Sequence, residues 1–352
     1  MSEPLYVPVL PVRQHARMAY EHLQPDIQAA VMPLWNLPPC PGLPRMELSG
    51  ARWQKELRRV RGAHRRHPGW IDAPFAEEAQ VPALAGILSE HCALTPLRPV
   101  TGPQRSVAQQ AAALETARRT GRGIGIRVCV PGEWNDCTVA AVRALVIKAA
   151  PDVRVDLLLD LGSVLPGRPG AGKDALRALD ALVPLASWRT TAVLGGGFPQ
   201  VADGLMEVGD LHEEPRSDWQ MWHEIRSSGR GYVTSLVFGD YGIQPVSALA
   251  QLPAGGGPPW GVLRYTVENS FVLCKVLTGG PDRTAVVRTA ARRIRHLADF
   301  RGAAASAGEA WLRDCADGSV ADSGGTGSHT QWLRAGSIQH FTYVVRYAWP
   351  PA

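Results

Sequence analysis

The sequence lacks the features that mark disulfide-rich, zinc-binding and membrane proteins. Its six cysteines form no Cys-x-x-Cys pair, and its ten histidines form no His-x-His or His-x-x-x-His pair. No window reaches the roughly 18 apolar residues that a membrane span needs. These absences argue against a disulfide framework, a zinc site and a transmembrane helix. The scattered cysteines and an N-terminal segment without a basic, apolar leader predict a cytoplasmic protein with no membrane partner.

Composition and charge are moderate and set wide limits. The chain has 352 residues, of which 45% are hydrophobic and 20% charged. Such a chain can bury a full core and is too apolar to be disordered. The formal net charge of +5 favours anionic partners such as nucleic acid or a nucleotide, although the excess is small for this length.

Short apolar runs recur along the chain, and helix-like sequence follows nearly every one of them. The eight runs cover residues 6–10, 31–35, 70–71, 93–100, 124–130, 153–161, 190–194 and 232–238. Repeated βα units form parallel sheets, and eight units close a barrel. We therefore predict an α/β fold with a (β/α)8 barrel over residues 1–250. An open doubly wound sheet is the alternative.

Residues 251–352 remain after the eighth run, and they predict a C-terminal α+β appendage packed on the barrel. Two β-rich runs at 260–267 and 270–277 predict a hairpin. The basic stretch 284–300 predicts a helix, and the run IQHFTYVVRYAW at 338–349 predicts a final strand.

Charged and polar side chains stand in or just after seven of the eight predicted strands. The carboxyl ends of parallel barrel strands meet at one mouth, where active sites lie. Arginines there suit an anionic ligand, and carboxylates suit a base or a metal ligand. A structural salt-bridge network is an equal alternative. The set comprises Arg13, Asn36, Asp72, Arg98, Arg127, Asp160 and Asp240.

Two further ligand sites follow from this placement. A Mg²⁺ site from Asp72, Asp160 and Asp240 stays open as a hypothesis, because Mg²⁺ needs only one or two carboxylates besides substrate oxygens. We assign no residue as a metal ligand, and the cofactor is unknown. Three glycines centred on Gly196 end the seventh unit and offer backbone N–H groups to a phosphate. A tight turn before Pro199 is the alternative.

Eight motifs, taken together and in order, resemble the Beta protein family of bacteriophages and bacteria. They are YVPVLPVRQHARMAYEHL, MPLWNLPP, VDLLLDLG, GGGFP, SDWQMW, VFGDYGI, LRYT and GSHTQWLRAGSIQHFTYVV, and they cover almost the whole chain. Members of this family occur in phages and near mobile-element or defence genes. The resemblance implies a setting of phage–host conflict, with a protein partner from a defence system, but it fixes no reaction.

The resemblance also adds residues to the candidate site. The chain departs from the family pattern at Pro11, Ala16 and Asn36, where that pattern favours a lysine and a glutamate in the first unit and a glutamate after the second strand. If those positions serve catalysis elsewhere in the family, this chain has altered chemistry or none. The matching positions are Asp160, Phe198, Pro199, Trp219, Asp240, Tyr241, Arg264, Tyr265, Trp332 and His340.

Together the residues predict hydrolysis of nucleic acid or nucleotides by a glycosylase-type or phosphoesterase-type reaction. Asp160, Asp240 and His340 would be catalytic. Aromatic side chains beside arginines suit a flipped or single-stranded base, while core packing is their alternative role. A non-catalytic binding or adaptor protein and a small-molecule phosphoester or sugar hydrolase are the competing functions. The predicted substrate-binding set is Arg13, Asn36, Asp72, Arg98, Arg127, Gly196, Phe198, Tyr241, Arg264, Tyr265 and Trp332.

Overall fold

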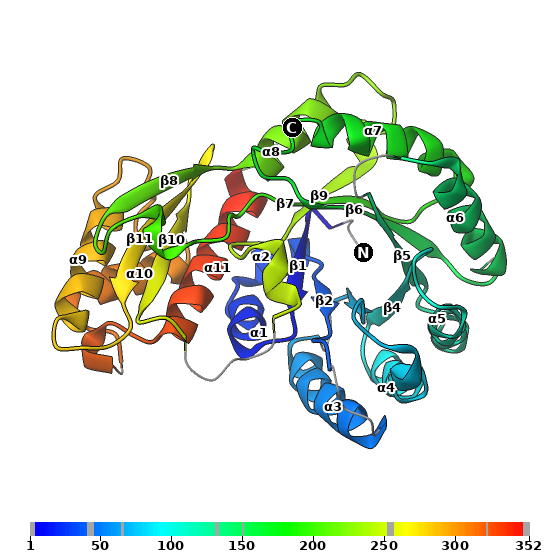
Figure 1. The fold of residues 1–352 in the computed structure, drawn as a ribbon, viewed down its shortest axis with the longest axis horizontal. Helices are drawn as coiled ribbons and strands as arrows, with labels where there is room; N and C mark the ends of the chain where they lie inside the picture. The colour runs from blue at the N-terminus through cyan, green and yellow to red at the C-terminus, as the bar shows by residue number, and fades with distance from the viewer. Residues whose placement is uncertain are drawn as a thin grey trace.

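The computed structural model is a closed barrel of eight parallel strands with a smaller lobe beside it (Figure 1). It describes residues 4–40, 46–64, 67–130, 134–149, 151–251, 257–321 and 323–347. The strands β1 and β9 pair in parallel and close the ring. The predicted (β/α)8 barrel is therefore confirmed. Its strands are β1 (Tyr6–Pro11), β2 (Leu34–Asn36), β3 (Gly69–Asp72), β4 (Leu97–Thr101), β5 (Ile124–Cys129), β6 (Val155–Ser163), β7 (Thr191–Gly196) and β9 (Leu236–Asp240).

The barrel strands read as continuous apolar runs because both of their faces are buried. On β6, Leu158 packs inside the barrel, whereas Leu157 and Leu159 pack against the surrounding helices. Side chains of successive strand residues point to opposite faces, so every second residue enters the interior. This alternation decides which strand-end residues reach the barrel mouth.

Helices surround the barrel and alternate with its strands along the chain. The helix α5 illustrates the local signals: the Ser106 hydroxyl accepts from the backbone of Gln109 at its start, and Gly121 ends it in the left-handed conformation at φ 64°. The helices before β9 are α1 (Gln14–Glu21), α2 (Pro25–Ala30), α3 (Met46–Ala63), α4 (Val81–Leu94), α5 (Val107–Thr120), α6 (Asp136–Ala149), α7 (Ala171–Leu182) and α8 (Ser217–Arg226). None of the helices in the described ranges could cross a membrane.

The smaller lobe is built on an antiparallel sheet of three strands in the order β10, β11 and β8. The hairpin of β10 (Trp260–Thr266) and β11 (Ser270–Leu277) and the basic helix α9 (Arg283–Arg295) are as predicted. The third strand, β8 (Leu211–Pro215), comes from the segment between β7 and β9. The chain therefore enters the smaller lobe twice, once between β7 and β9 and again after β9. The helix α10 (Ala307–Asp317) packs on α9.

The predicted final strand is wrong, because residues 329–347 form the helix α11 (His329–Tyr347). Figure 1 shows this helix between the barrel and the smaller lobe. Its second half is buried on nearly every side, so aromatic and β-branched residues such as Phe341, Val344 and Val345 fill all of its faces. A helix without a polar face loses the periodicity that identifies it in a sequence.

Candidate active site at the barrel mouth

Arg127 joins four elements at the carboxyl end of the barrel. It enters the interior from β5 and is 5% exposed. Its Nη1 donates to Asn36 Oδ1 and Asp72 Oδ2, both at 2.7 Å. Its Nε donates to Asp160 at 2.9 Å, and its Nη2 donates to the Tyr241 hydroxyl at 3.0 Å. Four residues of the predicted set are thus brought together around one guanidinium.

The Asp160 carboxylate is held by donors on several sides. Both of its oxygens lie 2.8 Å from the Tyr241 hydroxyl, and the backbone N–H of Gly162 donates to Oδ1 at 2.9 Å. Burial raises the pKa of Tyr241, and the negative charge of Asp160 raises it further. Tyr241 therefore stays protonated and donates to Asp160. Burial opposes the charge on Arg127, but Asp160, Tyr241 and Asp72 outweigh it and raise the pKa of Arg127.

Arg105 belongs to the same cluster although the sequence reasoning did not select it. Its Nη2 donates to the two oxygens of Asp72 at 3.2 and 3.0 Å. Asp72 is fully buried and thus accepts from two arginines. Arg105 stands in the loop between β4 and α5, four residues after the end of the strand. A search of the loops that follow the strands, rather than of the strands alone, would have found it.

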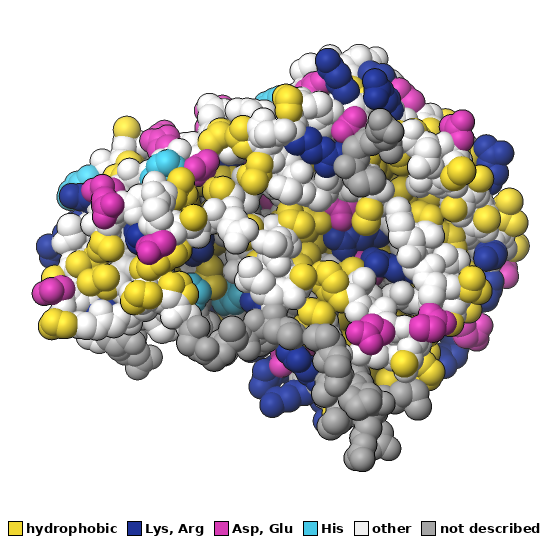
Figure 2. Space-filling model, in the orientation of Figure 1, with side chains coloured by type: hydrophobic (Ala, Val, Ile, Leu, Met, Phe, Trp, Pro, Cys, Tyr) yellow, Lys and Arg dark blue, Asp and Glu magenta, His cyan; other side chains and the backbone are white. Residues whose placement is uncertain are grey.

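A cavity of about 360 Å³ opens at this cluster. Arg105, Arg127, Asp160 and Tyr241 line it on one side, and apolar residues such as Phe75 line the rest. Figure 2 shows basic and acidic side chains next to each other in a hollow at the centre of the barrel. The volume lies in the range of small-ligand sites, and a few polar groups converge in an otherwise apolar wall. The mouth can therefore hold a ligand of limited size.

Asp240 and His340 form a separate cluster outside the barrel interior. Val237 of β9 and Tyr241, the residue after β9, face the interior, so Asp240 faces the layer that contains α11. His340 Nε2 lies 2.8 Å from Asp240 Oδ2, and its Nδ1 lies 2.9 Å from the Thr266 hydroxyl. Both side chains are almost completely buried. The expectation that Asp160 and Asp240 share one opening is wrong.

Burial raises the pKa of Asp240, but its partners outweigh burial. His340 opposes it most strongly, and the Tyr6 hydroxyl and the Gly242 N–H also donate to the carboxylate. The pKa of Asp240 is therefore lowered, and Asp240 is ionised. Because an ionised carboxylate only accepts, His340 Nε2 carries the proton of this hydrogen bond.

Asp218 of the SDWQMW motif and Arg216, which directly precedes that motif, lie beside this second cluster. Arg216 and Asp218 are fully buried, 3.7 Å apart, and neither oxygen of Asp218 has a hydrogen-bond donor among the described residues. Burial raises the pKa of Asp218 to about 6, against the opposing charge of Arg216. Arg216 also lies over the ring of Trp219 at 5.2 Å. The sequence reasoning noted Trp219 but missed its charged neighbours.

Arg98 lies at the opposite end of the barrel, so its predicted place at the mouth is wrong. It is the second residue of β4, and its Nη1 donates to Asp156 Oδ2 at 3.1 Å. Asp156 is likewise the second residue of β6. The amino ends of parallel strands gather at the barrel end that faces away from the mouth.

The glycines at the end of β7 and directly after it are closely packed. A side chain on Gly196 would overlap Val246, and one on Gly197 would overlap Asp218. Phe198 is buried between the barrel and the smaller lobe, where it contacts Phe271 at a ring distance of 5.1 Å. Close packing thus explains this glycine run without a phosphate.

Three of the other predicted binding residues lie at the junction or in the smaller lobe, and Arg13 lies in the loop after β1. Arg264 lies 5.3 Å over Phe198, and burial lowers its pKa to about 10. Tyr265 and Trp332 are core residues of the smaller lobe and do not reach the mouth. Arg13 contacts the carbonyl of Gln251 in the loop after β9. Of the aromatic residues in the predicted binding set, Tyr241 alone lines the mouth cavity.

A family profile described as Beta protein matches residues 6–346, which include both the barrel and the smaller lobe. The chain belongs to the Beta protein family. A search of curated proteins finds no significant match to it. The match ends at residue 346, within α11, so the part of this helix that carries His340 belongs to the matched region.

The described residues do not assemble the hypothetical Mg²⁺ site. Asp240 faces away from the mouth, while Arg127 and Arg105 occupy the carboxylates of Asp160 and Asp72. Among the described residues, no group of three or more histidine, cysteine or acidic side chains could hold a metal ion. The mouth is thus arranged for hydrogen bonding and ion pairing rather than for coordination.

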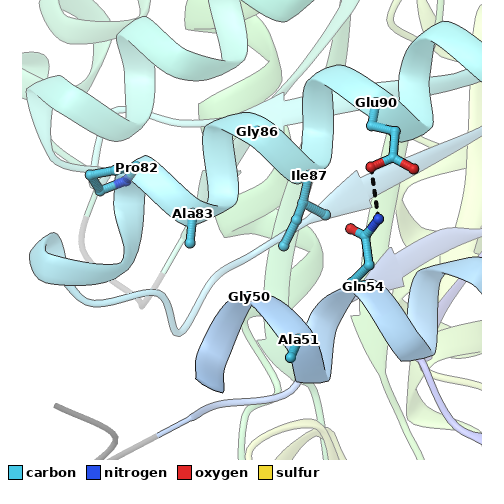
Figure 3. Close-up of a pocket in the computed structure, with 8 residues that line it drawn as sticks. All are labelled: Gly50, Ala51, Gln54, Pro82, Ala83, Gly86, Ile87 and Glu90. Carbon is cyan, nitrogen blue, oxygen red and sulfur yellow. Dashed lines mark hydrogen bonds between the residues drawn. The ribbon is translucent and has the colours of Figure 1, made fainter. Parts of the chain in front are cut away.

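Another hollow, of about 600 Å³, lies between α3 and α4 (Figure 3). Small residues such as Gly50 and Ala83 face each other across it, and Ile87 projects from α4 toward α3. Gln54 donates to Glu90 at 2.7 Å at one end. Its lining supplies fewer charged groups than the lining of the mouth cavity does.

Proposed function

We propose that this chain is a hydrolase that acts at the barrel mouth on a nucleotide, either free or within a single nucleic-acid strand. The observation that carries the proposal is the cavity of about 360 Å³ in which a carboxylate, a phenol and two guanidinium groups meet apolar walls. A base-sized group fits such a cavity, whereas a base within a duplex would have to leave the stack first. The family setting in phages and near defence genes supports nucleic-acid chemistry.

In the proposed reaction each mouth residue has a separate role. Asp160 is the carboxylate that lines the cavity, and it would accept a proton from the attacking water. Arg127 and Arg105 would bind a phosphate or the polar edge of a base. Phe75 and Tyr241 would flank the ring of the base. The bond cleaved is glycosidic or phosphoester, and Asp240 and His340 take no part.

A non-catalytic binding or adaptor role is the second candidate. One observation favours it: the mouth charges are paired with one another, with Arg127 bonded to Asp160 and both Arg127 and Arg105 bonded to Asp72. Paired charges can close a barrel end without catalysing a reaction. An adaptor of this kind would bind its partner without changing it chemically.

The test compares Asp160→Asn with Asp180→Asn. Asp180 accepts from Arg230 and Tyr232 on the protein surface, just as Asp160 accepts from Arg127 and Tyr241. The full chain is incubated with nucleotides, a single-stranded oligonucleotide, and plain and modified phage DNA. Mass spectrometry then detects a released base or phosphate. Thermal unfolding confirms that each variant is folded.

The two candidate functions predict different outcomes. Hydrolysis by the wild type and by Asp180→Asn, but not by Asp160→Asn, supports the enzyme. Absence of product from every substrate, together with binding that Asp160→Asn leaves unchanged, supports the adaptor. Product that forms equally with folded Asp160→Asn would contradict the assignment of Asp160.

A further inference from the structure

Four arginines gather at the end of the barrel that lies opposite the mouth. They surround a cavity of about 760 Å³, formed where the strands begin. Arg98 comes from β4 and Arg154 directly precedes β6, while Arg122 and Arg189 stand in the turns before β5 and β7. The described lining residues include no aspartate or glutamate.

The carboxylate beneath these arginines is shared and offsets only part of their charge. Asp156 is fully buried and accepts from Arg98 at 3.1 Å and from Arg189 Nε at 2.7 Å. The indole of Trp70 also donates to it at 2.9 Å. Four guanidinium groups thus face one carboxylate, which leaves an excess of positive charge around the cavity.

Several donors of this cluster remain free. Within the described residues, the side chain of Arg122 donates only through its Nε, to the carbonyl of Cys92 at 3.0 Å. Arg154 is exposed, and its side chain has no hydrogen-bond or ion-pair partner within the described part of the chain. Burial and the like charges of Arg189 and Arg154 lower the pKa of Arg98, although Asp156 opposes them. The positive charges of the neighbouring arginines therefore act on Arg98, the buried arginine of the cluster.

We infer that this end of the barrel is a second binding site, which takes a small ligand with two or more linked phosphates. Converging guanidinium groups with free N–H donors are the usual partners of phosphate oxygens. The cavity can hold several phosphates side by side, and its position on the far side of the barrel core separates it from the mouth. No aromatic ring lines the cavity among the described residues, so the phosphates supply the recognition.

The test is calorimetric titration of the full chain with tripolyphosphate at low salt. We expect saturable binding that weakens as salt is added. Arg154→Ala should weaken it about tenfold, the usual cost of one charge-assisted hydrogen bond. Arg154→Lys should retain part of the affinity. Arg143→Ala, which removes an exposed arginine of α6 outside the cavity, is the matched control and should bind as the wild type does.

Several outcomes would overturn the assignment. They are the absence of saturable binding, an equal loss with Arg143→Ala, and a loss caused by the mouth variant Asp160→Asn. Orthophosphate that binds as tightly as tripolyphosphate would contradict the requirement for linked phosphates. A single-stranded oligonucleotide without terminal phosphates is also tested. If it binds more tightly than tripolyphosphate, and its binding still depends on Arg154, the ligand is a nucleic-acid strand and not a small phosphate compound.

Discussion

Asp240 and His340 are 100 residues apart in sequence, yet Oδ2 of one lies 2.8 Å from Nε2 of the other. The pair joins β9 of the barrel to α11, and Thr266 extends the connection to β10 of the smaller lobe. The barrel and the smaller lobe therefore share a buried polar contact as well as apolar packing.

His340→Ala should lower the free energy of unfolding by about 3 to 5 kcal/mol, because it leaves the ionised Asp240 buried without its main partner. Urea unfolding followed by circular dichroism measures the change. Asp180→Asn breaks an exposed ion pair and should change stability far less. A His340→Ala protein as stable as that control would show that the junction does not depend on this contact.

The stability of the wild type should fall between about pH 4 and pH 7 because of Asp218. Burial raises its pKa to about 6 in the folded chain, whereas an aspartate in an unfolded chain titrates near ~4. The raised pKa adds to the free energy of unfolding while the carboxyl of Asp218 is protonated. This contribution is complete below the pKa of the unfolded chain and is lost as the pH rises through about 6. Asn cannot titrate, so Asp218→Asn removes this pH dependence.

The measurement is the difference in unfolding free energy between Asp218→Asn and the wild type. It should shift by roughly 2 to 3 kcal/mol in favour of the variant from pH 4 to pH 7. The change with pH is diagnostic, because the replacement of the carboxyl by an amide adds an offset that does not vary with pH, whereas the charge of Asp218 beside Arg216 does vary. A difference that does not vary with pH would mean that Asp218 titrates normally.

The sequence was sufficient to predict the barrel and part of its mouth. Strands buried on both faces leave continuous apolar runs, and polar residues such as Asp72 and Asp160 interrupt them where the strands reach the mouth. Arg127 is conspicuous for the same reason, since a charge within a buried strand needs a partner. These three residues meet in the structure as a single cluster.

The remaining site residues depended on details that the sequence leaves open. Asp240 and Tyr241 are neighbours, but only one of two successive strand residues can face the interior, and the apolar run before them does not show which. The apolar run at residues 93–100 ends soon after Arg98, which predicts that Arg98 lies near the carboxyl end of its strand. The strand β4 begins only at Leu97, so Arg98 lies near its amino end. His340 was placed on a strand because α11 lacks a polar face.

Arg127→Lys should destabilise the protein by about 3 to 5 kcal/mol. A lysine has one ammonium group and cannot reach Asn36, Asp72, Asp160 and Tyr241 together, so at least one buried acceptor loses its donor. Thermal and urea unfolding measure the loss. Arg230→Lys is the matched surface control, and an equal effect of both variants would contradict the bridging role.

Gly239→Ala should be strongly destabilising, because it adds a methyl group inside a closed ring of strands. The new Cβ would overlap the side chain of Leu194 and the carbonyl oxygen of Val7, on the two strands that flank β9. Neither backbone can move outward without breaking its strand pairing, so the expected loss is about 1 to 3 kcal/mol or more. Urea unfolding at constant pH provides the measurement.

The control for this variant should change stability in the opposite direction. Gly86 is an exposed residue within α4, and no atom outside its own helix turn lies within 4 Å of the position where a Cβ would stand. Gly86→Ala should raise the free energy of unfolding by about 0.5 to 1 kcal/mol, because alanine loses less backbone entropy in a helix. Equal effects of the two alanine substitutions would show that β9 is not packed as closely as its neighbours indicate.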